Sequence, residues 1–184
     1  SHCIKYQGEP AILAVVRDVS YDALFEECGI IRVGSVTELF YVAAALAAQP
    51  AAPGRRVAVV TNAGGPGILA TDALCGLGVT IGPLSDDTVT RLRAVLSPEA
   101  SVGNPVDALA AASAADYDAT IRAVLADPAV DGLLVIFVPP IMSDAEAVGR
   151  AIAQACREAN PGKPVVACFM MRSHTVSEGE RHLR

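Results

Sequence analysis

The sequence predicts an α/β fold in which helices pack against a small parallel sheet. From Arg56 onward, apolar strand-like segments alternate with helix-like segments at short spacing. Alanine, valine and leucine dominate a composition that is 52% hydrophobic but only 4% aromatic. Both features are typical of sheets built from right-handed strand–helix–strand crossovers. The 184 residues are enough for one such domain with an appendage or long flanks.

The segment before the linker Gln49–Gly54 (QPAAPG) is expected to form one strand and two helices. The second helix begins at Ser35, because Ser35 and Glu38 have the spacing of a capping box. The expected ranges are Ile12–Val16 for the strand, Tyr21–Cys28 for the short helix and Ser35–Ala48 for the longer one.

The segment after the linker has a more regular pattern, in which short apolar runs predict strands and capped stretches predict helices. Four or five strands suit a small flavodoxin-like or half-Rossmann sheet. The expected strands are Val57–Thr61, Val79–Ile81, Leu133–Val138 and Val165–Met170, with a fifth candidate near Ser101–Val102. The expected helices are Pro66–Leu77, Ser85–Leu96, Ala115–Ala126, Ser143–Ala159 and Thr175–Leu183.

The loop after the first regular strand, Asn62–Gly67 (NAGGPG), contains more glycine than a tight turn needs. A helix N-terminus offers unpaired backbone N–H groups and a partial positive charge. Gly64, Gly65 and Gly67 would let an anion approach the backbone, and Pro66 gives up an N–H that no helical carbonyl would accept. The loop therefore predicts an anion cradle, and a tight turn without a ligand is the alternative.

Two nucleotide signatures were compared with this loop. No Gly-Lys-Ser/Thr follows it, so a P-loop is excluded. The spacing Gly65-x-Gly67-x-x-Ala70 fits a loose dinucleotide fingerprint, but the next strand ends in Ile81–Leu84 (IGPL), without the acidic residue that a ribose needs. A phosphate is the better fit, and a dinucleotide stays open as the weaker one.

A second loop, Gly103–Asp107 (GNPVD), is expected to meet the first, because ligand sites of parallel sheets lie beyond the carboxyl ends of the strands. Its residues Asn104, Pro105 and Asp107 are therefore expected to line the site. A role in capping the next segment is equally consistent with the local sequence.

Several function classes find no support in the sequence. The net charge of −6, with no basic tract, argues against nucleic acid as a partner. No GxSxG elbow is present, and the three histidines lie near the chain ends. The five cysteines lack CxxC spacing, so neither zinc nor a disulfide framework is expected, and the reducing cytoplasm fits best. No apolar run reaches the length of a membrane span, and no signal peptide pattern is seen.

The order of several motifs resembles the NDP-forming acyl-CoA synthetases (acetate–CoA ligase, ADP-forming), which are relatives of succinyl-CoA synthetase. The resemblance runs from about Tyr21 to Arg184, and the succession TNAGGPG…GNPVD is its most specific part. The segments that carry it are YDALFEECGIIRV, VTELFYVAAALAAQP, RVAVVTNAGGPGILATDAL, ASVGNPVDALA, VDGLLVIFVPP, KPVVACFMM and VSEGERHL.

The resemblance implies a flavodoxin-like three-layer sandwich over residues 35–172, preceded by a flank or domain remnant (1–34) and followed by the start of a connecting helix (173–184). In this family, the domain holds the phosphate of a phosphohistidine at a helix N-terminus. In the family's reaction, an acyl phosphate forms and passes its phosphate to that histidine. Acyl-CoA is then released, and the histidine phosphorylates ADP. The positions that match the phosphate-binding loop are Asn62, Ala63, Gly64, Gly65, Pro66 and Gly67.

The resemblance also implies partners. CoA-binding, phosphohistidine and ATP-grasp domains complete the enzyme, which uses CoA and ATP or ADP with magnesium. The domain alone is expected to bind none of these cofactors and no metal, to meet only phosphate or an acyl phosphate, and not to complete the reaction. Homo-oligomerisation stays open.

Two departures from the family matter: the phosphohistidine motif differs, and the ATP-grasp domain that binds nucleotide is absent from this sequence. The family's phosphohistidine lies in SHTGA, whereas here Ser1-His2 is followed by CIKYQG, so we assign no catalytic residue and leave His2 open. Residues 6–20 resemble the end of a PAS sensor domain. The chain is thus interpreted as part of an acyl-CoA synthetase. The alternatives are a non-catalytic regulatory or sensor-linked module, as in synthetase-like halves of protein acetyltransferases, and a dinucleotide-binding oxidoreductase fragment.

Overall fold

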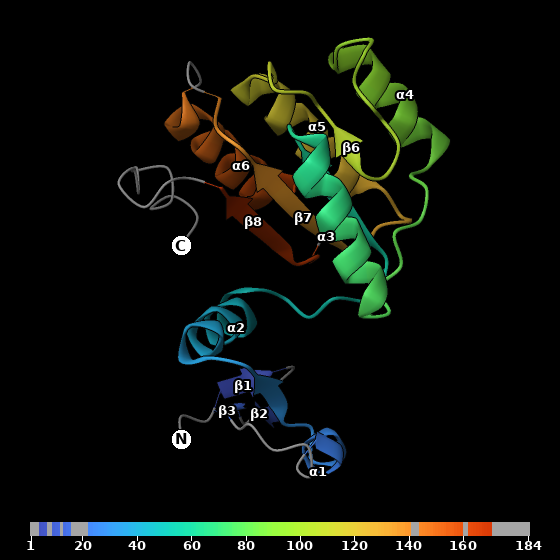
Figure 1. The fold of residues 1–184 in the computed structure, drawn as a ribbon. Helices are drawn as coiled ribbons and strands as arrows, with labels where there is room; N and C mark the ends of the chain where they lie inside the picture. The colour runs from blue at the N-terminus through green and yellow to red at the C-terminus, as the bar shows by residue number, and fades with distance from the viewer. Residues whose placement is uncertain are drawn as a thin grey trace. The chain divides into compact units, whose positions relative to one another are not determined.

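The structure is a computed structural model that describes residues 4–6, 9–11, 13–15, 22–140, 144–159 and 162–170. Contacts within the chain divide it into two compact units, Ser1–Ala51 and Ala52–Arg184. Each unit is considered by itself below (Figure 1). The domain limits expected from the sequence, at residues 34 and 172, stay predictions.

The first unit combines two-stranded sheets with two helices. Strands β1 and β2 pair antiparallel, and β3 and β4 pair parallel. The helix expected to begin at Ser35 does so: the Ser35 hydroxyl accepts a hydrogen bond from the Glu38 N–H. The Glu38 carboxylate accepts one from the N–H of Gly34. The elements are β1 (Ile4–Tyr6), β2 (Glu9–Ala11), β3 (Leu13–Val15), α1 (Asp22–Glu27), β4 (Ile31–Val33) and α2 (Val36–Ala48).

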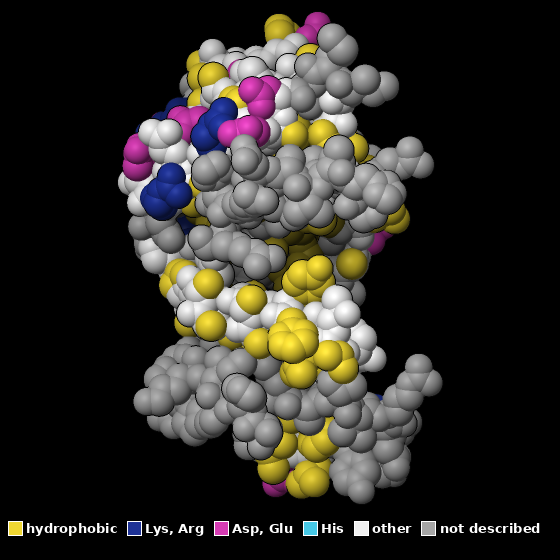
Figure 2. Space-filling view, turned by 90° about the vertical axis from the view of Figure 1, so that its left-hand side faces the viewer, with side chains coloured by type: hydrophobic (Ala, Val, Ile, Leu, Met, Phe, Trp, Pro, Cys, Tyr) yellow, Lys and Arg dark blue, Asp and Glu magenta, His cyan; other side chains and the backbone are white. Residues whose placement is uncertain are grey.

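Helix α2 is apolar on more than one side. One side packs on β1 and β3 of its own unit. Val36, Phe40 and Tyr41 are nevertheless 60%, 70% and 74% exposed, and Figure 2 shows hydrophobic side chains gathered on this helix. A helix that is hydrophobic all round is usually buried within a larger assembly.

The second unit is an α/β domain around a parallel sheet with strand order β6-β5-β7-β8, which confirms the predicted fold class (Figure 1). The strands are β5 (Val57–Thr61), β6 (Val106–Asp107), β7 (Gly132–Phe137) and β8 (Val165–Phe169). The helices are α3 (Gly64–Gly76), α4 (Asp86–Val95), α5 (Ala114–Ala126) and α6 (Ala145–Ala159).

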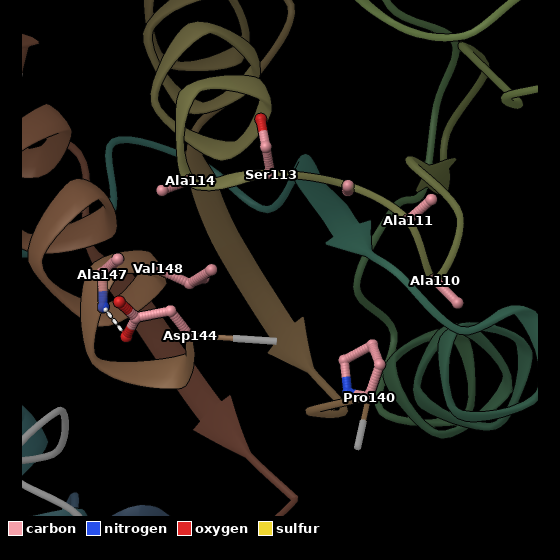
Figure 3. Close-up of a pocket in the computed structure, with 9 residues that line it drawn as sticks. Ala110, Ala111, Ser113, Ala114, Pro140, Asp144, Ala147 and Val148 are labelled. Atoms are coloured by element: carbon pink, nitrogen blue, oxygen red, sulfur yellow. Dashed lines mark hydrogen bonds between the residues drawn. The ribbon is translucent and has the colours of Figure 1, made fainter. Parts of the chain in front are cut away.

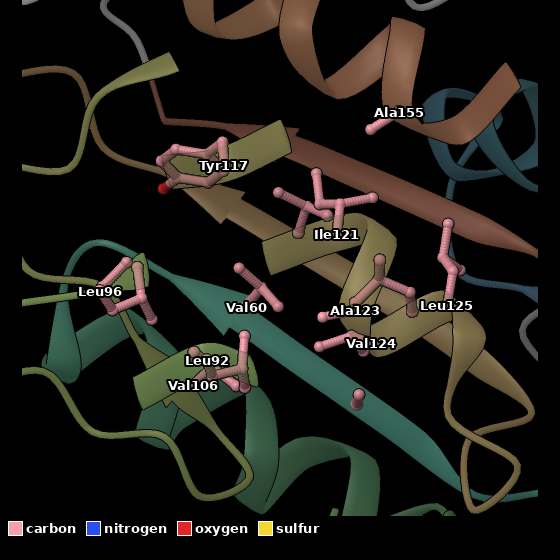
Figure 4. Packing of buried hydrophobic residues seen from close by; sticks show 14 of the residues in the cluster. Val60, Leu92, Leu96, Val106, Tyr117, Ile121, Ala123, Val124, Leu125 and Ala155 are labelled. Atoms are coloured by element: carbon pink, nitrogen blue, oxygen red, sulfur yellow. The ribbon is translucent and has the colours of Figure 1, made fainter. Parts of the chain in front are cut away.

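The main core lies between the sheet and helices α4, α5 and α6, whereas α3 packs against β5. Val60 of β5, paired with Val135 of β7, contributes to this core, and both are fully buried. Tyr117 of α5 packs edge-on against Phe137, with ring centroids 5.6 Å apart. Figure 4 shows Tyr117 and Ile121 of α5 among the buried side chains of this core. The largest buried side chains therefore fix α5 across the carboxyl half of the sheet.

The expected strand Val79–Ile81 is wrong, because this segment forms no strand. Only Thr80 bridges to Arg56, alongside the beginning of β5. The segment is bounded by Gly78, which has a φ of +74°, and by Gly82-Pro83, so it leaves the sheet after one bridge. The fourth strand is instead the two-residue β6.

Other boundaries differ from the expected ones by a few residues. Ser101, expected near a fifth strand, makes an isolated antiparallel bridge to Asp107. Asp144 caps α6, because its carboxylate accepts the N–H of Ala147 at 2.9 Å. The expected cap Ser143 and the expected helix Thr175–Leu183 lie outside the described residues.

An ion pair between the exposed Arg56 and the buried Asp131 holds the beginning of β5. The Arg56 guanidinium donates to both carboxylate oxygens of Asp131, at 2.8 and 2.6 Å, and the Arg56 N–H donates to the same carboxylate at 2.9 Å. These hydrogen bonds from Arg56 lower the pKa of Asp131 to about 2. Because the folded chain releases this proton more readily than an unfolded one, the pair stabilises the fold above the ordinary aspartate pKa of about 4.

The substitution Asp131→Asn should therefore flatten the acid dependence of stability. In the parent chain, the contribution of this carboxylate to the free energy of unfolding is lost as the pH falls from about 4 to about 2. Urea unfolding followed by circular dichroism at several pH values measures this slope. Asp87→Asn, at an exposed pair with Arg91, is the control and should keep the parent slope. Equal slopes for Asp131→Asn and the parent would contradict this role.

Candidate functional site

The loop that is predicted to be an anion cradle lies where β5 ends and α3 begins. The Thr61 hydroxyl accepts the N–H of Ala63 at 3.0 Å and donates to the Ala63 carbonyl at 3.1 Å, which turns the chain out of the sheet. The first helical hydrogen bond follows, from the Gly67 N–H to the Ala63 carbonyl. Gly67 is buried against Thr61, and its Cα hydrogen points at the threonine methyl.

The N-terminus of α3 has no capping side chain. Ala63 occupies the N-cap position, and its methyl side chain cannot accept a hydrogen bond from the N–H groups of the first turn. The other helices of this unit are capped, by Ser85, Ser113 and Asp144. Within the described part of the chain, no acceptor is found for the N–H groups of Gly64 and Gly65. These two donors can therefore serve an external anion.

The three glycines of the cradle differ in what surrounds them. A methyl group at Gly67 would lie 2.9 Å from the Thr61 methyl, so glycine is required there for packing. A methyl group at Gly64 would lie 3.2 Å from Oδ2 of Asp107. At Gly65 no atom of the described residues lies within 4 Å of that position, and both Gly64 and Gly65 are exposed. The fold explains Gly67, but it leaves open space beside Gly65.

Asn62, predicted to bind phosphate, is buried and bonded to β7. Its side-chain amide donates to the Val138 carbonyl at 2.8 Å and accepts the Val138 N–H at 2.9 Å. This pair replaces a rung of the ladder between β5 and β7 beyond Thr61. The Asn62 side chain thus fixes where the cradle begins, and only its backbone continues into the loop.

Asn104, predicted to line the site, is likewise bonded to backbone. Its side chain accepts from the Val59 N–H and donates to the carbonyls of Val57 and Gly82, each at 2.9 Å. It thereby joins β5 to the segment that follows α3. Its peptide bond to the partly exposed Pro105 is cis. The first half of the GNPVD loop is therefore held along the middle of β5.

Asp107 is the predicted residue of this second loop that reaches the cradle. Its Oδ1 accepts the Leu109 N–H at 3.0 Å, and its Oδ2 lies beside Gly64. Leu109 has a φ of +69°, a left-handed conformation that side chains other than glycine rarely adopt. Burial, and then the charge of Asp107, raises the pKa of Tyr117. The structure thus brings Asp107 and Gly64 together, as the sheet topology predicted.

A hollow of about 380 Å³ lies at the beginnings of α5 and α6, where the loops after β6 and β7 approach each other (Figure 3). Its walls are mostly alanine methyl groups. Its polar side chains, Ser113 and Asp144, cap α5 and α6. The described residues that line it are Ala110, Ala111, Ala112, Ser113, Ala114, Pro140, Asp144, Ala147 and Val148.

Comparison with known proteins identifies the family. Residues 57–180 match the Ligase-CoA domain. The chain belongs to this family. It is 40% identical over 152 residues to acetate–CoA ligase (ADP-forming) II subunit alpha of Pyrococcus furiosus, covering 82% of this chain and 33% of that protein. It is 34% identical over 165 residues to acetate–CoA ligase (ADP-forming) I of Archaeoglobus fulgidus, covering 90% and 22%.

A solved structure extends the likeness to three dimensions. The dinucleotide-forming acetyl-coenzyme A synthetase 1 of Candidatus Korarchaeum cryptofilum, in complex with phosphate and ADP, superposes with a TM-score of 0.82. It shares 29% sequence identity and covers 89% of this chain and 35% of that chain. The family resemblance and the predicted fold are thereby confirmed. The Ligase-CoA match does not reach residues 6–20, whose likeness to a PAS domain stays a prediction.

This Ligase-CoA chain spans a third or less of the length of the curated relatives above. Its described residues hold no cluster of three or more acidic, histidine or cysteine side chains that could bind a metal, and the described cysteines are free thiols. No helix in the described ranges is long and apolar enough to cross a bilayer. His2 lies outside the described residues, so its role stays open.

The sequence analysis missed two residues that shape the cradle. Thr61 was assigned only to the strand, although its hydroxyl makes the turn and its methyl fits against Gly67. A threonine that ends a buried strand directly before a glycine-rich loop is a usable signal for such a turn. Nothing in the sequence predicted the left-handed conformation of Leu109, because leucine does not favour a positive φ.

The cradle glycines should respond in opposite directions to alanine. Gly67→Ala places a methyl group against Thr61 and should lower the free energy of unfolding by about 1–3 kcal/mol. Gly65→Ala meets open space and should raise it by up to about 1 kcal/mol, because glycine is a poor helix former. Urea unfolding of both variants measures the difference. A loss of stability in Gly65→Ala comparable to that in Gly67→Ala would show that the space beside Gly65 is not open.

Proposed function

We propose that this Ligase-CoA chain is the phosphate-holding domain of an ADP-forming acyl-CoA synthetase, which converts an acid, CoA and ATP to an acyl-CoA, ADP and phosphate. In this proposal, the N-terminus of α3 binds the phosphoryl group of a phosphohistidine that another domain presents, or a free phosphate or acyl phosphate. The binding positions are Asn62, Ala63, Gly64, Gly65, Pro66 and Gly67. Of the other predicted residues, Asp107 lies beside these positions, and Asn104 and Pro105 would act by holding the loop along β5.

The observation that carries the proposal is the uncapped start of α3 with open space beside Gly65. Gly64 and Gly65 present N–H groups at the positive end of the helix dipole, and a doubly negative phosphate gains from both. The relatives named above support phosphate as the anion, because they are ADP-forming acetate–CoA ligases and one was solved with phosphate and ADP.

Exposed apolar surface supports the part of the proposal that concerns partner domains. Ile68 and Leu69 lie one turn beyond Gly64 and Gly65 and are 60% and 71% exposed. Apolar residues beside a polar site are typical of surfaces that another protein segment covers. We infer that the phosphohistidine domain approaches the cradle along this side of α3, and that CoA-binding and ATP-grasp domains complete the enzyme.

The cofactors are assigned on the same basis. CoA and ATP or ADP with magnesium would be held by the partner domains, since the described residues of this chain offer no metal cluster. In this proposal the enzyme works in the cytoplasm, which the free thiols of the described cysteines support. The isolated chain would bind phosphate but would not catalyse the synthesis of acyl-CoA.

Binding to the isotope-labelled 184-residue chain tests the proposal. Inorganic phosphate and acetyl phosphate, added separately, should shift the amide signals of Gly64, Gly65 and Gly67, whereas NAD should not. Gly65→Asp should weaken phosphate binding at least tenfold, because its carboxylate would occupy and repel the anion position.

Gly76→Asp is the matched control, because Gly76 is exposed at the other end of α3 and has no atom near its Cβ position. It adds the same charge away from the cradle and should keep phosphate binding. If phosphate moves none of the three glycine signals, the cradle assignment is wrong. If only NAD moves them, the chain is a dinucleotide-binding domain instead.

A further inference from the structure

We propose that helix α2 of this chain pairs with α2 of a second copy, antiparallel and about a two-fold axis beside Ala44. This inference goes beyond the proposed function, because it assigns a surface of the first unit that the phosphate site does not use. Phosphate binding at the cradle and pairing through α2 are tested separately, and neither result decides the other.

The surface is the side of α2 that its own unit leaves uncovered. The opposite side carries the partly buried Leu39, Val42 and Leu46 and packs on strands of the same unit. The uncovered side, called the outer face below, carries exposed apolar residues that the helical period brings together. They are Val36, Phe40, Tyr41, Ala44, Ala47 and Ala48.

The outer face carries no charge. Glu38 is the only charged residue in the sequence of α2, and its carboxylate accepts the N–H of Gly34 at the start of the helix. Two copies of a charged face would repel each other, whereas two copies of this face do not. Pairing would remove Phe40 and Tyr41, which are 70% and 74% exposed, from contact with water.

The sizes of the side chains favour a second copy as the occupant. An interface about a two-fold axis must be complementary to itself. The aromatic rings lie in the amino-terminal half of the outer face, and alanines fill its carboxyl-terminal half. An antiparallel pair with its axis beside Ala44 places Phe40 opposite Ala48 of the other copy, and Tyr41 opposite Ala47. Large side chains then meet small ones, as in packed interiors.

Other arrangements fit the outer face less well. A parallel pair would place ring against ring at one end and leave gaps between alanines at the other. An antiparallel pair also sets each helix dipole against the opposite end of its neighbour. A different partner would need no such self-complementary gradient of size along the helix. The gradient is therefore the observation that assigns the face to a second copy.

The length of α2 sets the expected strength of the dimer. The helix has 13 residues and is about 20 Å long. Contact between two such helices falls below the roughly 1,200 Å² of total buried surface that is usual for stable complexes. The dimer should therefore be weak, with a dissociation constant in the micromolar range or above.

Sedimentation equilibrium of the full 184-residue chain, from about 1 to about 500 μM, tests the inference. A reducing agent keeps the free thiols from forming disulfides between copies. The parent chain should dimerise. Phe40→Ala should weaken the dimer at least about tenfold, because both copies lose an aromatic anchor. Ala48→Phe should weaken it similarly, because rings would then collide at both ends.

The two changes combined in one chain test the register. Phe40→Ala with Ala48→Phe exchanges the large and the small position, and should restore the parent dissociation constant to within about threefold. Ala44→Glu places two carboxylates beside the axis and should leave the chain monomeric. Ala94→Glu, at an exposed alanine of α4, is the matched control and should dimerise like the parent. Circular dichroism confirms that each variant keeps its helix content.

Three results would overturn the inference. A parent chain that stays monomeric at every concentration would leave the outer face to another occupant, such as a further domain of the synthetase. A dimer that survives Ala44→Glu would form through another surface. A combined variant that dimerises no better than its two single changes would exclude the antiparallel pairing beside Ala44.

Discussion

The structure of the site depends on how strand β5 ends. β5 lies inside the sheet, between β6 and β7, so its last residue is held from both sides. The Ala108 N–H donates to the Thr61 carbonyl from the β6 side, and Asn62 exchanges two hydrogen bonds with Val138 on the β7 side. Thr61 then turns the chain by bonding Ala63. The start of α3 is therefore fixed relative to both neighbouring strands before any ligand binds.

The same arrangement explains why two loops far apart in the sequence share one site. In a parallel sheet, the carboxyl ends of neighbouring strands meet at one edge. β6 is only two residues long, yet its pairing with β5 is enough to bring Asp107 beside Gly64. Asn104 supports this short strand by bonding the backbone of β5 before it.

Local patterns in the sequence were sufficient to predict most of the fold, whereas the location of the site stays a prediction. Strands β5, β7 and β8 are short apolar runs, and Ser35 and Ser85 are recognisable helix caps. The prediction of a strand at Val79–Ile81 was wrong, because a run of three residues carries too little periodicity to show whether it pairs with a neighbouring strand.

Contacts between distant residues were beyond what the sequence could predict. Asn62 bonds a residue 76 positions away and Asn104 one 45 positions away. An asparagine in a loop gives the same local signal whether it bonds a ligand, its own turn or a distant strand. Its partner depends on the register of the sheet, which sequence patterns leave undetermined. The position of Asp107 was predictable as far as the sheet edge, but its contact with Gly64 was not.

The N-terminus of α3 lacks residues that would increase the free energy of unfolding. A serine or aspartate at the N-cap typically contributes about 1 kcal/mol, and the helices α4, α5 and α6 have one. Ala63 lacks this contribution. Gly65 adds a conformational cost of up to about 1 kcal/mol, and the described residues give no packing reason for it. Together these are a noticeable part of the 5–15 kcal/mol that is roughly typical for a folded domain. Local sacrifices of stability are expected where a chain must bind something, and here a capping side chain would occupy the donors that an anion needs. An anion on Gly64 and Gly65 would itself act as the missing cap, so binding would stabilise α3 in proportion to the logarithm of ligand concentration.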